Sequence, residues 1–448
     1  MDWSMLLSTR RFQCLAQKVT PVVGGSDPLT AGLRTDYHVD HDRIVFSSAF
    51  RRLGRKTQVH SLSRHDHAHN RLTHSIEVAS VGRSLGNRVG AMLAQRGYLP
   101  ERNTPFDIGT IVQVACLAHD IGNPPFGHTG EDALREWFCQ PAHQHYLAPL
   151  SAAERLDIET YEGNAHGLRT VSRLEMYGGA GGMRLTSAVL GALMKYPWTS
   201  EVGAANRKFG VYQSELPYFQ AVAETLGLPS RGRDIAWARH PLSYLMEAAD
   251  DLCYAIVDLE DAVEMGMLAV SEFEALFAPL ANYERALQEP DLRQRCAMLR
   301  GMAVGHCVAV LADRFMAHHD ELLAGTFPEK DLIAVCEGPV RDTLIAAKAL
   351  ASQKVYRHRD KLVTEIAAYP CLGALLSLLV PAAFVYCTQG PQALTHRQGA
   401  ELALLDYPFA AGDSLYSAYM RILDFIGGMT DNTAARLARE VSGVGLVS

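Results

Sequence analysis

The chain has 448 residues, of which 48% are hydrophobic and 20% are charged, and its formal net charge is −7. This composition is ordinary for a globular protein, and the length allows two or three domains or one large core with appendages. The acidic balance argues against a general polyanion-binding surface. Any contact with phosphate groups must therefore come from a local basic cluster such as FRRLGRK at residues 50–56.

The cysteines and the N-terminus predict a cytoplasmic protein. The nine cysteines are scattered and include no CxxC pair, which favours reduced thiols over a disulfide framework or a zinc ribbon. The first residues lack the basic stretch and long apolar stretch of a signal peptide. The apolar run CLGALLSLLVPAAFVYC (371–387) is slightly short for a membrane span and contains Pro381. We therefore expect buried helices in this run and no membrane.

Helical periodicity dominates the chain. Residues 71–97 space their apolar side chains as an amphipathic helix, and residues 107–122 are almost continuously apolar, which predicts a buried central helix. Strands are scarce, and only KFGVYQSE (208–215) predicts a small hairpin. Further helical patterns occur at residues 240–266, 295–319 and 416–440. These elements predict a mainly α fold that divides near residue 270 into a first helical bundle and a C-terminal helical region.

The end of the central helix carries ionisable side chains that suggest a metal. A lone helical histidine such as His74 is most often a residue whose hydrogen bonds are satisfied locally. His119 and Asp120, however, end an apolar helix, where burial is costly unless a cation or hydrogen bonds satisfy both groups. Asp250 lies between apolar stretches of a later helix, on one face with Tyr254 and Asp258. Two imidazoles and two carboxylates make a borderline-to-hard site.

The stretch LAHDIGNPPFGHTGE (117–131) turns a rigid corner after that helix. A helix that needs only to stop can do so with one glycine, yet here Gly, Asn and two prolines are followed by His128 and Glu131. The corner raises the question of what this second pair of ionisable side chains does.

Several motifs resemble one family of HD-domain phosphohydrolases. The order His74, His119–Asp120, Asp250 resembles the HD domain in general, and the surrounding motifs resemble the deoxyguanosine triphosphate triphosphohydrolase (dGTPase) family. The resemblance runs from about residue 34 to residue 431 and is carried by DRIVFSSAFRRLGRKTQV, NRLTHSIEVA, LAHDIGNPPFGHTGE, YEGNAHGLR, MRLTSAVLGALMKYP, MEAADDLCYAIVDLEDA and DFIGGMTD.

The resemblance implies a role for each matching residue. The implied metal ligands are His74, His119, Asp120 and Asp250, and the implied catalytic pair is His128 and Glu131. Gln58 matches a residue that contacts the sugar. The positions that match the surroundings of the nucleotide are Asn164, Lys195, Tyr196, Tyr254 and Asp258, with Arg421 as a weaker match that reaches a neighbouring subunit.

The implied activity is the hydrolysis of deoxynucleoside triphosphates, with dGTP favoured, to deoxynucleoside and inorganic triphosphate. The implied cofactor is a divalent metal, its identity open among Mn, Mg, Fe, Co and Ni. Residues 1–270 would form the HD-domain core with an N-terminal arm. Residues 271–448 would pack on this core and on neighbouring subunits of a homo-oligomer, a tetramer or a hexamer.

Two alternatives stay open at this point. The first is another HD-domain nucleotide phosphohydrolase, such as a nucleotidase or a phosphodiesterase. The second is a relative that binds nucleotides or single-stranded DNA with little turnover. SLSRHDHAHNRLTH (61–74) is rich in histidine where the family usually has an arginine–threonine pair, and residues 195–234 also depart from the family. Base preference and a regulatory dNTP site therefore stay open, and we interpret His65, His67 and His69 as a solvated loop.

Overall fold

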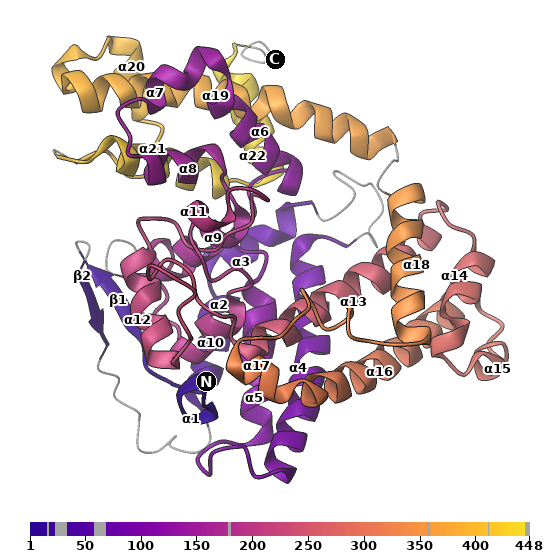
Figure 1. Cartoon of the computed structure of the whole chain (residues 1–448). Coiled ribbons are helices and arrows are strands. Elements are labelled where there is room, and N and C mark those ends of the chain that lie inside the picture. Colours follow the sequence, from indigo (N-terminus) through magenta and orange to yellow (C-terminus); the bar gives the residue numbers. More distant parts are fainter. Residues whose placement is uncertain are drawn as a thin grey trace.

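The computed structural model describes residues 1–15, 18–22, 34–57, 69–177, 181–355, 359–410 and 412–443. Helices dominate these ranges, which confirms the mainly α fold with a small hairpin (Figure 1). The hairpin consists of β1 (Phe12–Leu15) and β2 (Lys18–Pro21), an antiparallel pair in which Phe12 lies opposite Pro21.

The hairpin predicted at residues 208–215 was wrong. That segment makes only a one-residue parallel bridge between Val211 and Thr199, and the amides of Gly210 and Val211 both donate to the Trp198 carbonyl. A short alternation of apolar residues can fold as a packed loop when a neighbouring segment supplies its hydrogen bonds. The strands β1 and β2 are only four residues long, so they carry too little alternation to be recognised from sequence.

Three long helices form the centre of the molecule: α4 (Arg71–Gln95), α5 (Pro105–Ala118) and α13 (Pro241–Glu264). They match the helices predicted at residues 71–97, 107–122 and 240–266. Glycines allow α4 and α5 to approach closely, because a Cβ added to Gly86 would lie 2.7 Å from the Gly109 Cα atom. Asn70 caps α4 and Pro105 begins α5 at the position where proline is favoured.

Further helices surround these three (Figure 1). One group lies beside the hairpin and comprises α1 (Trp3–Leu6), α2 (Asp36–Val45), α3 (Ser48–Arg52), α10 (Ser187–Leu193) and α12 (Leu216–Leu226). A lobe on the other side comprises α14 (Val270–Phe277), α15 (Tyr283–Ala286), α16 (Leu292–Ala317), α17 (His319–Ala324) and α18 (Pro339–Lys354). One continuous hydrophobic core joins both groups to the central helices. The domain boundary near residue 270 stays a prediction.

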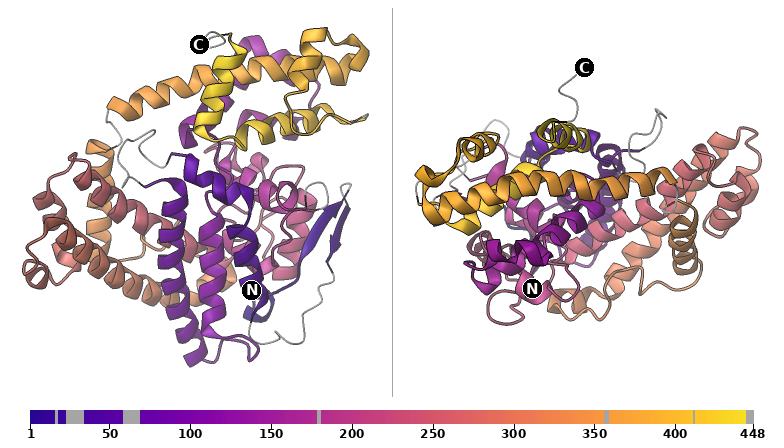
Figure 2. Two further views of the ribbon diagram at one scale, coloured as in Figure 1. Left: turned by 180° about the vertical axis from the view of Figure 1, so that it is seen from behind. Right: turned by 90° about the horizontal axis from the view of Figure 1, so that it is seen from above.

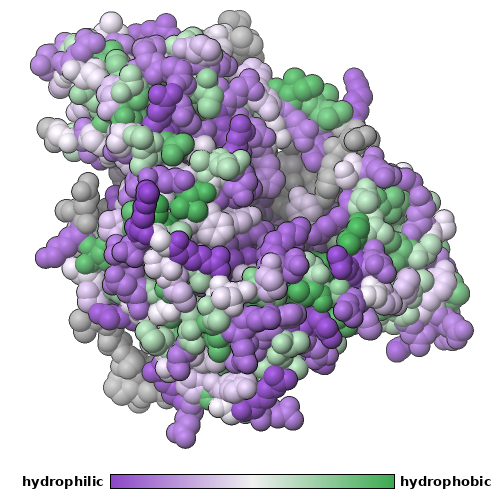
Figure 3. Space-filling view, viewed as in Figure 1, coloured by the Kyte–Doolittle hydropathy of each residue, from purple (hydrophilic) through white to green (hydrophobic). Residues whose placement is uncertain are grey.

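A second helical layer lies across one end of the central helices (Figures 1 and 2). We call it the C-terminal layer, because the helices from residue 359 onward belong to it. It has its own hydrophobic core, which combines residues 133–165 with the C-terminal helices. Its helices are α6 (Gly127–Cys139), α7 (Gln144–Leu147), α8 (Ala152–Glu159), α9 (Gly163–Arg169), α11 (Ser200–Gly203), α19 (Arg359–Gln389), α20 (His396–Leu402), α21 (Leu415–Gly427) and α22 (Asp431–Val441). Between this C-terminal layer and the lobe of α14–α18, the surface is hollowed (Figure 3).

The apolar run at residues 371–387 was predicted to form buried helices, and it forms part of one helix with one face buried. α19 passes through Pro370 and Pro381 without ending, because its packing against α6, α21 and α22 outweighs the hydrogen bonds that proline removes. By length and composition, α16 and residues Lys361–Gln389 of α19 could each cross a membrane, and 39% of the most apolar window of each is buried. The core helix of a globular protein passes the same test.

Candidate functional site

His74, His119 and Asp120 converge at the centre of the fold. One ligand atom from each lies within 4.8 Å of the other two, and this is the group found among the residues that the structure describes. His74 lies in the first turn of α4, and His119 ends α5. The close contact of α4 with α5 therefore brings together side chains that are 45 residues apart in the sequence.

Asp250 reaches the same cluster from α13. Its Oδ1 atom lies 3.1 Å from the Nε2 atom of His74 and 3.5 Å from that of His119. The Nδ1 atom of His119 donates to the Cys116 carbonyl at 2.6 Å, which leaves Nε2 facing the carboxylates. Burial alone would lower the pKa of His119, but Asp120 and Asp250 outweigh it and raise this pKa to about 9. Two imidazoles and two carboxylates thus meet in one buried place, and this donor set fits a divalent metal ion.

Arg71 and Asn123 orient the carboxylate of Asp120. The Arg71 guanidinium donates to Oδ2 at 2.7 Å, and the Asn123 side chain donates to Oδ1. Burial would raise the pKa of Asp120, but Arg71 and the two histidines lower it below its usual value, so the carboxylate stays ionised. The sequence analysis did not single out Arg71 or Asn123. The available signal was their spacing, since Arg71 precedes His74 by one helical turn and Asn123 follows Asp120 by three residues.

The corner after α5 carries the His128–Glu131 pair. Phe126 and Gly127 both have left-handed backbone angles, with φ of 64° and 58°, and they start α6. The Nδ1 atom of His128 lies 3.2 Å from Oε2 of Glu131. The side chain of His128 is 71% exposed, whereas that of Glu131 is 2% exposed. A buried carboxylate therefore holds an exposed imidazole, and the Nε2 atom of His128 can exchange a proton with a bound molecule.

Glu131 is itself held in place. Its Oε1 atom accepts from the Gly163 amide at 2.8 Å, and its Oε2 atom accepts from Arg135 at 3.3 Å. Burial would raise the pKa of Glu131, but His128, Lys208 and Arg135 lower it. The carboxylate is thus ionised and can stabilise a protonated His128.

The structure places the remaining predicted residues as follows. Tyr254 lies beside the cluster, with its ring 6.0 Å from the ring of His74, and Asp258 is buried one helical turn further along α13. Asn164 donates to Glu162 at 2.9 Å, near Glu131. Gln58, His65 and His67 lie outside the described residues.

Lys195 and Tyr196 lie together after α10. The Nζ atom of Lys195 is 3.0 Å from Glu247 and 5.6 Å from the centre of the Tyr196 ring. Burial would lower the pKa of Lys195, but Glu247 outweighs it and raises this pKa. Glu247 also pairs with Arg239 at 2.8 Å, so one carboxylate positions two cations.

Two predicted residues are held in other surroundings. Arg421 donates to the Pro408 carbonyl and to Asp413, both within the C-terminal layer, so the contacts it makes in this chain are not with the cluster. His69 lies between Asp261 and Glu77, which raise its pKa to about 10. The interpretation of His69 as solvated was wrong, because two acidic side chains enclose it and it is half-buried.

Lys208 is a further candidate that the sequence analysis assigned only to a hairpin. Its Nζ atom lies 2.8 Å from Oε1 of Glu162, the residue that also holds Asn164. It therefore adds a cation on the side of the corner that faces α9. Its position within KFGVYQSE gave no signal of this contact.

The fold and the candidate metal cluster agree with a match to a known class of protein domain. Residues 71–174 match the family model of the HD domain. The matching range begins at Arg71 and includes His74, His119, Asp120, His128 and Glu131, so it covers the corner and every member of the cluster except Asp250.

Three relatives define the family within this class. A deoxyguanosinetriphosphate triphosphohydrolase-like protein of Pseudomonas aeruginosa is 46% identical over 99% of both chains. One of Synechocystis sp. is 35% identical over the whole of both chains, and a deoxyguanosinetriphosphate triphosphohydrolase of Salmonella schwarzengrund is 31% identical over 78% of each. The chain belongs to this dGTPase family of HD-domain proteins.

Proposed function

We propose that this protein is a metal-dependent deoxynucleoside triphosphate triphosphohydrolase with dGTP as the favoured substrate. Two features support the proposal: the cluster of His74, His119, Asp120 and Asp250, and the buried Glu131 beside an exposed His128. Arg71 connects them, because it donates to Asp120 and a Cβ added to Gly127 of the corner would clash with its Nη2 atom. A structural metal site needs no second acid–base pair, so this arrangement favours an enzyme.

The four proposed ligands would hold one divalent ion, open in identity among Mn, Mg, Fe, Co and Ni. When bound, such an ion supplies Lewis-acid stabilisation of phosphate charge and lowers the pKa of a water molecule. Arg71 helps to keep Asp120 ionised, and the hydrogen bonds from Arg71 and Asn123 orient it for the ion.

The residues of the corner would supply the proton that the leaving 5′-oxygen needs. Water attacks the α-phosphorus, the bond from phosphorus to the 5′-oxygen breaks, and the triphosphate leaves in one piece with the oxygen of that water. The 5′-oxygen is a poor leaving group unless it receives a proton, which His128 can give as a general acid with Glu131 stabilising the charged imidazole. The alternative role of His128 is to orient the attacking water. Lys195 would neutralise the outer phosphates, and Gln58, Asn164, Tyr196, Tyr254 and Asp258 would surround the nucleotide.

The family also suggests the setting of the reaction. We propose a cytoplasmic homo-oligomer, a tetramer or a hexamer, in which Arg421 faces a neighbouring subunit. The exposed apolar residues Leu362, Val363 and Ile366 of α19 support an interface in this region. Light scattering at micromolar concentration tests the assembly, and a monomer would contradict it.

One experiment tests the reaction. The purified protein is incubated with each dNTP and NTP in the presence of Mn²⁺, Mg²⁺ or Co²⁺, and the products are separated by ion-exchange chromatography. We expect deoxynucleoside and inorganic triphosphate. Orthophosphate or pyrophosphate as the first product would favour another HD-domain phosphohydrolase. Tight binding of nucleotides or single-stranded DNA without turnover would favour the second alternative, a relative that binds these ligands but hydrolyses little.

A further inference from the structure

The C-terminal motif GGMTD (427–431) contacts the back of the corner that carries His128 and Glu131. Asp431 is the first residue of α22 and is 6% exposed. Its Oδ1 atom accepts from the Phe126 amide at 2.9 Å. Its Oδ2 atom accepts from the amide of Thr57 at 2.9 Å and from the Thr57 hydroxyl at 2.6 Å. One carboxylate therefore joins three segments that are far apart in the sequence.

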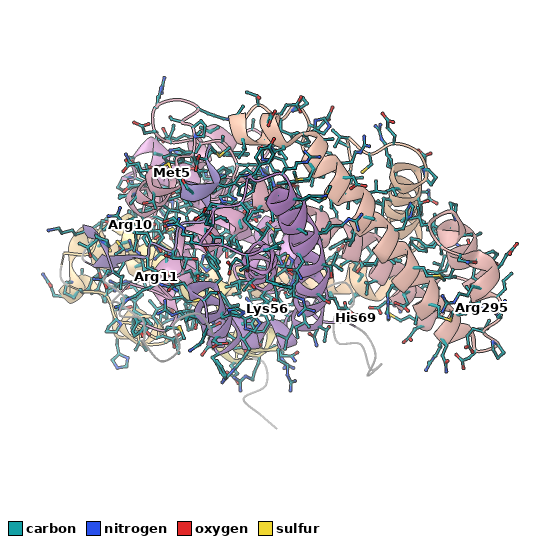
Figure 4. All side chains as sticks on the ribbon, turned by 90° about the horizontal axis from the view of Figure 1, so that it is seen from below. Met5, Arg10, Arg11, Lys56, His69 and Arg295 are labelled. Carbon is teal, nitrogen blue, oxygen red and sulfur yellow. The ribbon has the colours of Figure 1, made fainter. Side chains whose placement is uncertain are left out.

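Lys56 makes a second connection at the same junction. It is buried, and its Nζ atom donates to the Asn123 carbonyl at 2.6 Å and to the Gly427 carbonyl at 2.7 Å. Gly427 ends α21, so the amino group of Lys56 also supplies a hydrogen-bond donor to the carbonyl end of that helix. Lys56 lies in the interior of the molecule near the start of α4, in contrast to Arg295 at its edge (Figure 4).

The contact with Phe126 has a specific consequence. Phe126 is a non-glycine residue in the left-handed region, where its Cβ atom comes too close to the following carbonyl oxygen, so this conformation is unfavourable relative to the right-handed one. Its amide has Asp431 as the partner that the structure records, and it lies two residues before His128. Without this acceptor, the Phe126–Gly127 step would relax toward conformations that turn the start of α6 away from the cluster.

We propose that Asp431 is a positioning residue: its carboxylate holds the left-handed Phe126–Gly127 step that aims His128 and Glu131, so the C-terminal layer is required for turnover as well as for folding. The inference rests on the proposed function. It assigns to DFIGGMTD a role in the same chain, distinct from the proposed contact of Arg421 with a neighbouring subunit.

Asp40 provides a matched control. It is also buried, and its Oδ2 atom likewise accepts from the amide and the hydroxyl of one threonine, Thr186, at 2.8 and 2.7 Å. Its other oxygen accepts from Arg11, so this carboxylate joins segments beside the hairpin and does not contact the corner. Asp40→Asn and Asp431→Asn each replace one of two accepting oxygens with an NH2 group that can only donate, so each variant loses the bonds of one oxygen, at Asp40 beside the hairpin and at Asp431 beside the corner.

The experiment compares these variants under conditions where each is folded. Three quantities are measured: steady-state dGTP hydrolysis, metal content, and hydrogen exchange of peptides covering residues 121–131. We expect Asp431→Asn to lower kcat about 10–100-fold, the range that a small misplacement of reacting groups produces, with KM within about threefold and metal content unchanged. Exchange at 121–131 should rise in this variant. Asp40→Asn should lower stability but keep kcat and this exchange pattern.

A rescue variant separates positioning from stability. Glycine adopts the left-handed conformation without the steric cost, so adding Phe126→Gly to Asp431→Asn should restore kcat about fivefold or more. If Asp431 contributes only to folding, losing the Phe126 side chain should lower activity further. Should Asp431→Asn fail to fold, Thr57→Val removes one bond to the same carboxylate and should lower kcat by a smaller factor.

The outcomes are distinguishable from a failure of the proposed function. If the parent protein does not hydrolyse any dNTP, the exchange comparison still tests whether Asp431 orders the corner. Unchanged exchange in Asp431→Asn, an equal loss of kcat in Asp40→Asn, or no recovery with Phe126→Gly would each overturn the positioning role.

Discussion

The proposed metal ligands and the proposed catalytic pair depend on different parts of the fold. His74, His119, Asp120 and Asp250 all come from α4, from α13 or from the end of α5, within the first hydrophobic core. His128 and Glu131 start a helix of the C-terminal layer, and Asp431 and Lys56 hold the corner that leads to them. Metal binding and proton transfer should therefore be separable by mutation, although His128 follows Asp120 by only eight residues in the sequence.

Loss of a ligand should have the largest effect. Removal of His119 or Asp250, as in His119→Ala or Asp250→Asn, takes one donor from a four-donor site, so the metal content should fall from about one ion per chain to near zero. Turnover should fall with it. Elemental analysis of the purified variants provides the measurement, and full occupancy in both would show that the ligand assignment is wrong.

Loss of His128 should leave the metal side intact. His128→Ala should keep the metal content and the unfolding temperature but lower turnover by ~10²–10⁴-fold, the usual contribution of acid–base assistance. Steady-state kinetics and elemental analysis on the same sample separate the two effects. A decrease in turnover of less than about tenfold would remove His128 from the mechanism.

Discrimination between deoxyribose and ribose should depend on the corner and not on the metal ligands. The proposed sugar contact, Gln58, directly follows Thr57, which donates hydrogen bonds to Asp431. The parent protein should prefer dGTP to GTP by on the order of 10²-fold in kcat/KM, since a closely packed site disfavours the additional hydroxyl. Gln58→Ala should reduce that ratio while the metal content stays unchanged. Equal use of dGTP and GTP by the parent would contradict the proposed recognition of the sugar.

Acid should destabilise α13, the helix that carries Asp250. His240 caps α13, accepts from the Leu242 amide, donates to the Leu6 carbonyl, and is fully buried. Burial lowers its pKa to about 4, so below pH 6.5 the unfolded chain takes up a proton that the folded chain does not. The stability that neutral His240 contributes is present above pH 6.5 and is lost as the pH falls toward 4.

This loss is about 2 kcal/mol at pH 5. It should be absent in His240→Asn, whose side chain can still cap the helix. The free energy of unfolding of parent and variant is measured by urea titration at pH 7 and at pH 5. Between these pH values, the parent should lose about 2 kcal/mol more than the variant. A difference that does not change with pH would show that His240 is protonated in the folded protein.

The sequence predicted the parts of the site that belong to continuous helices. Apolar periodicity located α4, α5 and α13. The free-energy cost of burying His119 and Asp120 at a helix end indicated a metal. The corner was also recognisable, because its glycine, asparagine and prolines exceed what a helix end requires. The bonds of Lys195 to Glu247 and of Lys208 to Glu162 were not, because nothing in the local sequence distinguishes a lysine at an exposed surface from one beside a buried carboxylate.

Sequence by itself determined the helices, the donor types and the family, since each follows from local periodicity, side-chain chemistry or motif order. Tertiary structure alone decided what orders the corner. Lys56, Phe126 and Asp431 are up to 375 residues apart, and the hydrogen bonds among their segments exist only because two hydrophobic cores pack against each other. The left-handed angle of Phe126 has the same origin, because an unfavourable backbone conformation persists where the surrounding contacts outweigh its cost.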